Sequence, residues 1–294
     1  MRAILPAAVA GLALASIGFP SVSAAQTPTP VTAASPYSYA DVADLATVAP
    51  MAILGRIYKV AALKPEQAPS LKTGQARLYV EADVVSLIRG SGPLAARINY
   101  LVDLPLDSKG KPPKLKKKQA VLIFARPVAG AAAGANSTAA VRLVAPDAQL
   151  DWDPATEARL RAILTEAVKP GAPPAITGVA NGFHVPGALP GEGETQLFLD
   201  TRTGEPVSLT VLTAADGSRR WAAAFGEIVD GTAAVPARDT LAWYRLACGL
   251  PRTLPLAKLG GTAPEDRKKA ASDYGVVLGA LGDCTRTRTP PPGS

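Results

Sequence analysis

Short apolar runs separated by turn-forming residues fill most of the first half of the sequence, and this pattern limits the fold more than any other feature. The runs are rich in valine, isoleucine and leucine, while glycine, proline and lysine gather between them. Such an alternation is typical of β-strands joined by loops. The predicted strands begin near Met51, Ala76, Ala96, Gln119 and Val141. Because no long helical pattern separates the first four, we expect a small antiparallel β-barrel within residues 38–149.

Residues 51–128 also resemble the netrin-like modules, whose barrels are of the OB type. The resemblance is carried by the strand order GRIYKV then EADVVSLIRG, by the turn at 88–90, and by the basic loop that leads into AVLIFARPV. It implies an OB-like barrel. Netrin-like metalloproteinase inhibitors use an amino-terminal cysteine, and this chain has no cysteine before Cys248. The resemblance therefore implies a fold and transfers no inhibitory residue.

The second half predicts a C-terminal α+β domain over residues 173–285. Its four apolar runs are separated by turns that contain glycine and aspartate, which is typical of an antiparallel meander. A linking helix within residues 150–172 precedes it. The Pro- and Thr-rich ends predict a flexible linker, 26–37, and a disordered tail, 286–294. The predicted fold class is α+β, with an OB-like barrel followed by a meander packed with two or three helices.

Capping residues and stop signals predict the helices. Ser38 can cap a short helix in front of the first strand, and a last helix is expected over residues 264–281. Between them, a helix capped by Asp239 or Thr240 ends at Gly249. This helix is apolar around most of its circumference, so we expect it to be buried and to lie on the meander.

The first residues have the order of a secretory signal peptide. Arg2 precedes an apolar run over residues 3–19, and small residues follow it. We expect residues 1–25 to be a signal peptide cleaved after Ala24 or Ala25. No later stretch of the sequence is apolar for long enough to span a membrane. The mature protein is therefore expected to be periplasmic or secreted.

The chain has two cysteines, Cys248 and Cys284. In an exported protein two cysteines favour a disulfide, because the compartment is oxidising. A bridge across 36 residues would stabilise the fold by about 4 kcal/mol on the chain-entropy model. Two free buried thiols are the alternative.

A cluster of lysines is the strongest charge feature of a sequence whose formal net charge is +7. All six lie in the loop before the fourth strand and form a candidate anion-binding site: Lys109, Lys111, Lys114, Lys116, Lys117 and Lys118. Such a cluster can attract an anionic envelope component. A solvated loop without a ligand is the alternative. Nucleic acid is not an expected partner, since export removes it and no aromatic residues alternate with the lysines.

A second candidate ligand site involves His184, the only histidine of the chain. Glycine and proline surround it, which favours a loop position. Glu227, Asp230 and Asp239 lie where the last strand turns into the buried helix, and they can form either a ligand site or a cap and ion pair. One histidine excludes a multi-histidine metal site within one chain. The sequence assigns no catalytic residue, metal or cofactor.

These features favour an exported, non-enzymatic binding or interaction module. Its partner is expected to be another protein or an anionic envelope component. The first alternative is a carboxylate-dependent envelope hydrolase that uses His184 or Glu227. The second is a protease inhibitor, which the netrin-like resemblance alone supports.

Overall fold

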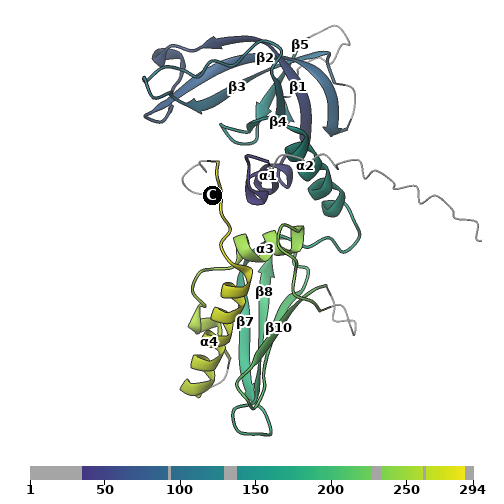
Figure 1. Cartoon of the computed structure of the whole chain (residues 1–294), viewed down its shortest axis with the longest axis vertical. Helices are drawn as coiled ribbons and strands as arrows, with labels where there is room; N and C mark the ends of the chain where they lie inside the picture. The colour runs from purple at the N-terminus through teal and green to yellow at the C-terminus, as the bar shows by residue number, and fades with distance from the viewer. Residues whose placement is uncertain (1–34, 92–93, 129–137, 227–232, 261–262, 289–294) are drawn as a thin grey trace, which may run out of the picture. The chain divides into compact units, whose positions relative to one another are not determined.

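The computed structural model describes residues 35–91, 94–128, 138–226, 233–260 and 263–288. In these residues the chain forms ten β-strands in two sheets and four α-helices (Figure 1), which confirms the predicted α+β class. The expected signal peptide, 1–25, and the linker up to residue 34 lie outside the described residues. Among the helices of the described ranges, none is long and apolar enough to cross a membrane.

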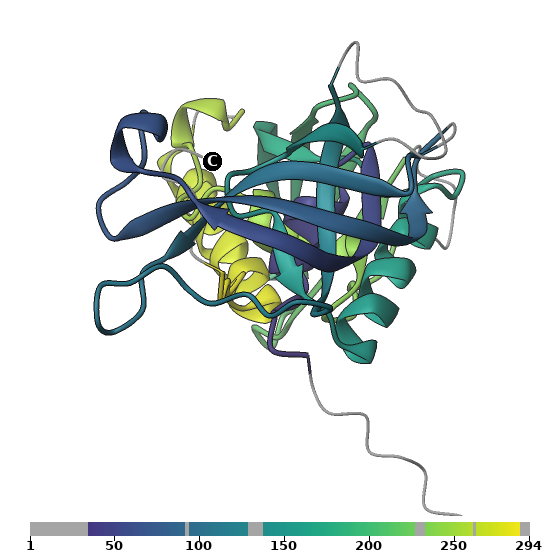
Figure 2. The ribbon, with the colours of Figure 1, turned by 90° about the horizontal axis from the view of Figure 1, so that it is seen from above.

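The first sheet closes on itself as a barrel. Its strands are β1 (Met51–Ala62), β2 (Gln75–Arg89), β3 (Arg97–Pro105), β4 (Ala120–Pro127), β5 (Thr138–Leu143) and β6 (Gln149–Asp151). They follow the order β1-β2-β3-β5-β4-β6, and an additional pairing of β1 with β4 completes the ring. The predicted barrel is confirmed, with long strands that lie side by side in Figure 2.

One seam of the barrel differs from the predicted antiparallel arrangement. β5 pairs with β3 in parallel and with β4 antiparallel. The reason is the path of the chain, since β5 returns between two strands that already run in opposite directions. The three-residue β6 was not predicted, because three residues are too few to show the alternation of apolar and polar residues that identifies a strand.

The barrel interior is filled by aliphatic and aromatic side chains. Along β2 the buried residues Ala76, Leu78, Val80 and Ala82 alternate with partly exposed ones, as the period of a strand requires. Every residue from Val121 to Ala125 of β4 is buried, so neither face of this central stretch is exposed to water.

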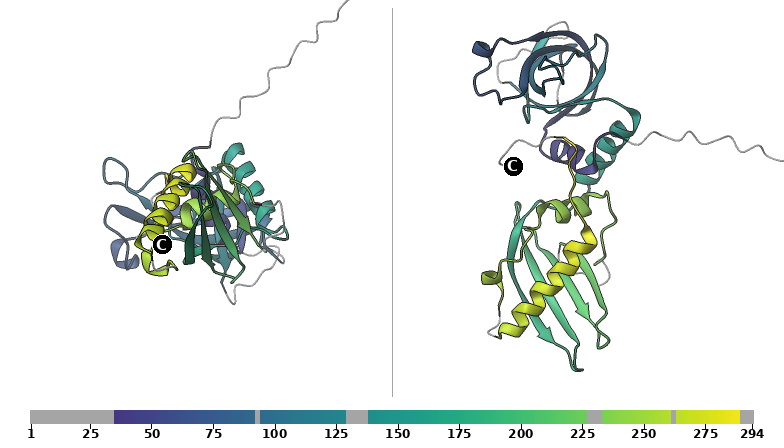
Figure 3. Two further views of the ribbon diagram at one scale, coloured as in Figure 1. Left: turned by 90° about the horizontal axis from the view of Figure 1, so that it is seen from below. Right: turned by 60° about the vertical axis from the view of Figure 1, so that its left-hand side comes forward.

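The second sheet is the predicted antiparallel meander. It contains β7 (Ile176–Pro186), β8 (Gly193–Thr201), β9 (Val207–Thr213) and β10 (Arg219–Phe225), in the order β10-β9-β8-β7. Helix α4 (Pro264–Leu281) crosses one face of this sheet and contacts all four strands (Figure 3, right). Its buried side of Tyr274, Val277 and Leu281 faces that core.

Helix α3 (Leu241–Gly249) forms where it was predicted and begins at the predicted cap Thr240. The predicted contact with the meander is present but is made through β7, while α4 crosses the face of the sheet. α3 contacts α1 (Tyr39–Ala46), α2 (Pro154–Ala167), α4 and β7. A helix that is apolar all round needs partners on several sides, and one sheet face cannot supply them.

The aromatic residues of α3 pack against these neighbouring elements and form hydrogen bonds with them. The ring of Trp243 meets the Tyr39 ring edge-on at 6.1 Å between centroids, and its Nε1 donates to the Leu281 carbonyl. The Tyr244 hydroxyl donates to Asp44 of α1 at 2.7 Å. Each ring therefore buries its apolar area while its polar tip keeps a partner.

The predicted disulfide between Cys248 and Cys284 is confirmed, with 5.2 Å between the Cα atoms. It fixes the chain at the end of α4, and the following residues differ from the predicted disordered tail. Arg286 donates to Asp44 at 2.6 and 3.0 Å, and Arg288 donates to Asp147 at 2.7 Å. Residues 286–288 are held in place by these bonds.

Asp41 of α1 holds the same segment through its carboxylate. Its side chain is fully buried and accepts hydrogen bonds from the backbone of Ser38, Thr287 and Arg288 and from the Thr287 hydroxyl. Burial alone would raise the pKa of Asp41, but the hydrogen bonds from Thr287, Ser38 and Arg288 outweigh it and hold the pKa below its ordinary value.

Asp41→Asn is expected to lower the free energy of unfolding at pH 7 by about 1–3 kcal/mol, since an amide cannot accept all these bonds. A lowered folded-state pKa means that the ionised carboxylate stabilises the fold above its unfolded pKa of about 4, and that this contribution is lost in acid. The difference between the variant and the wild type should therefore shrink below about pH 4. Urea unfolding at several pH values measures it.

The exposed Asp200 supplies the control. Asp200→Asn should leave the stability within about 0.5 kcal/mol of the wild type. Equal stability of Asp41→Asn and the wild type at pH 7 would contradict the role given to Asp41.

Candidate functional site

The predicted lysine cluster forms an exposed surface between β3 and β4, here named the lysine loop and defined as residues 106–119. All six lysines are exposed. None of them is in an ion pair with a carboxylate of the described residues. Asp107 instead accepts the backbone N–H groups of Lys109 and Lys111. The turn is thus ordered by its backbone, and the ammonium groups stay in solvent.

The positive surface continues onto β1 through an aromatic ring. The guanidinium of Arg97 lies 3.5 Å from the ring centroid of Tyr58, and the ammonium of Lys117 lies 5.3 Å from it. Both distances are in the range of cation–π contacts. Arg97 is also paired with Asp83, so the uncompensated charge at this place comes from the lysine loop.

His184 lies in β7, directly opposite Thr195 of β8, and not in the predicted loop. Its Nδ1 is 2.9 Å from the Thr195 hydroxyl, which donates to Asp273 of α4 at 2.5 Å. Nε of Arg219 lies 3.1 Å from the other carboxylate oxygen of Asp273. The four residues form a polar network between the sheet and α4. The sequence predicted a loop at His184 because glycine and proline surround it, but β7 extends through these residues to Pro186.

This network is closed to a substrate. The His184 side chain is 5% exposed and that of Asp273 is 0% exposed. Gly193 lies against the imidazole, and a Cβ at this position would be only 2.5 Å from Cε1 of His184. An acid–base role requires contact with the reacting group, so the described geometry favours a structural role in joining α4 to the sheet.

The acidic corner is only partly described. Glu227 and Asp230 lie outside the described residues. Asp239 is exposed and adopts a φ of 59°, directly before the cap of α3. The adjacent Arg238 places its guanidinium 5.0 Å from the ring centroid of Trp243. Asp239 and His184 belong to different clusters, and the described residues do not join them into one ligand site.

A cleft of about 660 Å³, here named the arginine cleft, was not predicted from the sequence. Its lining includes Arg202, Arg245, Arg286 and Arg288. These arginines come from the turn after β8, from α3 and from the segment after the disulfide. Arg202, Arg245 and the pair Arg286 and Arg288 are too far apart in the chain for a sequence motif to connect them.

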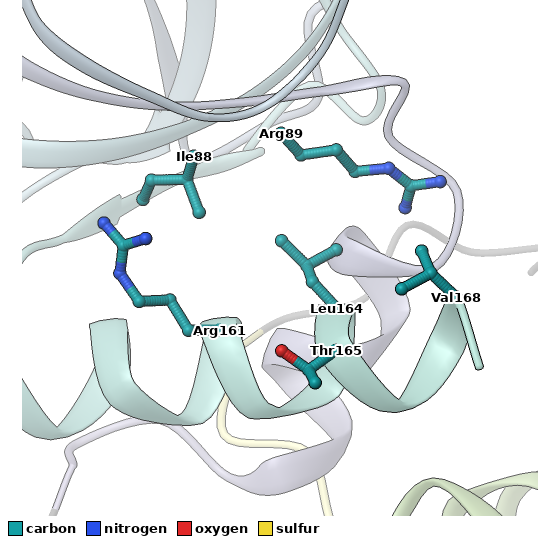
Figure 4. A pocket seen from close by; sticks show the side chains of 6 residues that line it. All are labelled: Ile88, Arg89, Arg161, Leu164, Thr165 and Val168. Carbon is teal, nitrogen blue, oxygen red and sulfur yellow. The ribbon is translucent and has the colours of Figure 1, made fainter.

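A smaller cavity of about 380 Å³ lies between β2 and α2 (Figure 4). Ile88, Leu164 and Val168 line it together with two arginines. Arg161 is paired with Glu157, and Arg89 donates to the carbonyl of Ala46. Each of the two guanidinium groups therefore has a partner within the protein.

Comparisons with known proteins add no functional assignment to these residues. No protein-family model matches the sequence, and no curated protein has significant similarity to it.

Gly193→Ala is expected to destabilise the fold by about 1–3 kcal/mol, because the new methyl group overlaps the His184 ring. The same change should cost less in a His184→Ala background, where the ring is absent, although the carbonyl of Val185 still lies 3.1 Å from the Cβ position. Urea unfolding of the two single variants and the double variant measures the coupling.

Gly279→Ala on α4 is the matched control, because nothing lies within 4 Å of its Cβ position. It should stabilise the helix by about 0.5–1 kcal/mol. Additive effects of Gly193→Ala and His184→Ala would contradict the close packing of this network.

Proposed function

We propose that this chain is an exported, non-enzymatic binding module that attaches to an anionic membrane surface of the envelope through the lysine loop. The observation that carries the proposal is the set of six exposed lysines with no carboxylate partner among the described residues. A lysine near an anionic lipid surface contributes about 1 kcal/mol of binding. Six together are enough for stable attachment at moderate salt.

Export is supported by the order of the first residues and by the Cys248–Cys284 disulfide. Disulfides persist in oxidising compartments and are rare in the cytosol. The proposal therefore includes a cleaved signal peptide, residues 1–25, and a periplasmic or secreted mature protein. It also keeps the barrel as a member of the OB type, as the netrin-like resemblance implies.

The two alternative functions receive less support from the described residues. An envelope hydrolase would need an accessible acid or base. His184 does not supply one, since it is packed between Gly193, Thr195 and α4, and Glu227 lies outside the described residues. A netrin-like inhibitor would need the amino-terminal cysteine that this sequence lacks.

Reversal of three charges, Lys109→Glu, Lys111→Glu and Lys114→Glu together, is expected to weaken binding to vesicles that contain phosphatidylglycerol by about a hundredfold or more, because three favourable contributions are lost and replaced by repulsion. Co-sedimentation of the mature protein with the vesicles measures the affinity. Binding of the wild type should also fall steeply as salt increases.

The control reverses three exposed lysines outside the loop, Lys169→Glu, Lys258→Glu and Lys269→Glu. It changes the net charge equally and should retain most of the binding. An equal loss of vesicle affinity in the two triple variants would mean that binding depends only on net charge, which would contradict the proposal. Binding to heparin without binding to vesicles would contradict a membrane surface as the partner.

Export is tested separately by the amino terminus of the mature protein. Expression of the full chain in a Gram-negative host should yield periplasmic protein that begins at Ala25 or Gln26, because the small residues before these positions fit a signal-peptidase site. Amino-terminal sequencing and intact mass measure it. A cytoplasmic protein that retains residues 1–25 would contradict the export proposal and leave the vesicle experiment unaffected.

A further inference from the structure

The arginine cleft is formed by segments that are distant in the sequence. The wall includes Asp44 of α1, Arg202 in the turn after β8, Tyr244 and Arg245 of α3, and the segment after Cys284. All of these residues lie in one compact unit, Ala33–Ser294. The volume of about 660 Å³ is within the usual range for small-molecule sites.

Positive charge in the cleft exceeds the negative charge that faces it. Arg286 is paired with Asp44, and Arg288 is paired with Asp147. Arg202 and Arg245 have no carboxylate partner within the described part of the chain. Two guanidinium charges are therefore not compensated by the protein.

Arg245 is held in this position although the position is electrostatically unfavourable. Its Nε donates to the carbonyl of Pro173 at 3.2 Å, and its guanidinium lies 5.6 Å from the ring centroid of Tyr244. Burial lowers the pKa of Arg245, and the positive charge of Arg202 lowers it further. An anion between the two guanidinium groups would remove this repulsion.

Arg288 adds an unused donor. Its side chain is 10% exposed, and its buried Nε has no hydrogen-bond partner within the described residues. A buried donor without an acceptor costs free energy, and the cost is larger for a charged group than for a neutral one. Because this Nε has almost no accessible surface, a ligand oxygen would reach it only after a shift of the Arg288 side chain.

We infer that the arginine cleft binds a small organic anion that carries a carboxylate or phosphate group. Arg202 and Arg245 bind the oxyanion, since guanidinium groups match the paired oxygens of both groups. The apolar lining from Leu45, Val48, Val144 and Ile176 would contact the carbon part of the ligand.

The site is separate from the lysine loop in chemistry. The lysines are exposed point charges, which suit an extended anionic surface. The arginines line a concave cleft with a fixed arrangement, which suits one small molecule. A result that contradicts one of the two proposals therefore leaves the other unaffected.

The test measures binding of inorganic phosphate and of citrate to the full mature chain by isothermal titration calorimetry at low salt. The wild type should show saturable binding of at least one probe, with a stoichiometry of one. Citrate binding alone would identify a carboxylate ligand, phosphate binding alone would identify a phosphate ligand, and binding of both would support the shared oxyanion chemistry. The absence of saturable binding for both probes would overturn the inference.

Arg202→Gln together with Arg245→Gln should weaken binding at least tenfold. The exposed arginines Arg56 and Arg220 supply the charge-matched control, and Arg56→Gln with Arg220→Gln should leave the affinity unchanged. If the loss of Arg245 disturbs folding, Arg202→Gln alone keeps the test decisive, because Arg202 is exposed and outside the core. Equal affinities of wild type and Arg202→Gln would overturn the inference. The lysine-loop variant should bind both probes as the wild type does.

Discussion

The fold depends on a buried carboxylate, that of Asp41, which joins the two ends of the described chain. A charge removed from water is costly unless hydrogen bonds replace its hydration. Asp41 receives them from Ser38 beside it and from Thr287 and Arg288 at the other end of the chain. The disulfide at Cys284 limits how far this carboxy-terminal segment can move. Through these bonds Arg286 and Arg288 become part of the arginine cleft.

Sequence patterns predicted the features that depend on neighbouring residues in the chain. The cap Ser38, the cap at Asp239 or Thr240, the apolar run from Ala76 and the stop at Gly249 each act over a few residues, and the structure contains the corresponding elements. The cysteine pairing was also predictable, because two cysteines have one pairing. Long-range contacts could not be predicted in this way. The parallel pairing of β3 with β5 and the packing of α3 depend on which surfaces remain uncovered after the other elements have packed.

The candidate sites divide in the same way. The lysine loop was visible because its six charges are close in sequence. The arginine cleft was not, because Arg202 and Arg245 meet only after β8 and α3 have been placed. Residues 286–288 were predicted as a disordered tail from their composition, whereas specific carboxylates on α1 and near β6 bind them. Composition describes an average segment, and it carries no information about partners that lie more than a hundred residues away.

The position of His184 favours a structural role for this residue. The only histidine is joined to Thr195 and Asp273, and its ring touches Gly193. Buried polar groups in such a network fix one relative position of the elements they join, since any shift would leave a donor or acceptor unpaired. Here they hold α4 on the meander, and α4 in turn holds Cys284 near Cys248. The His184 network is thus one of several contacts that hold α4 on the sheet, beside the buried Tyr274, Val277 and Leu281.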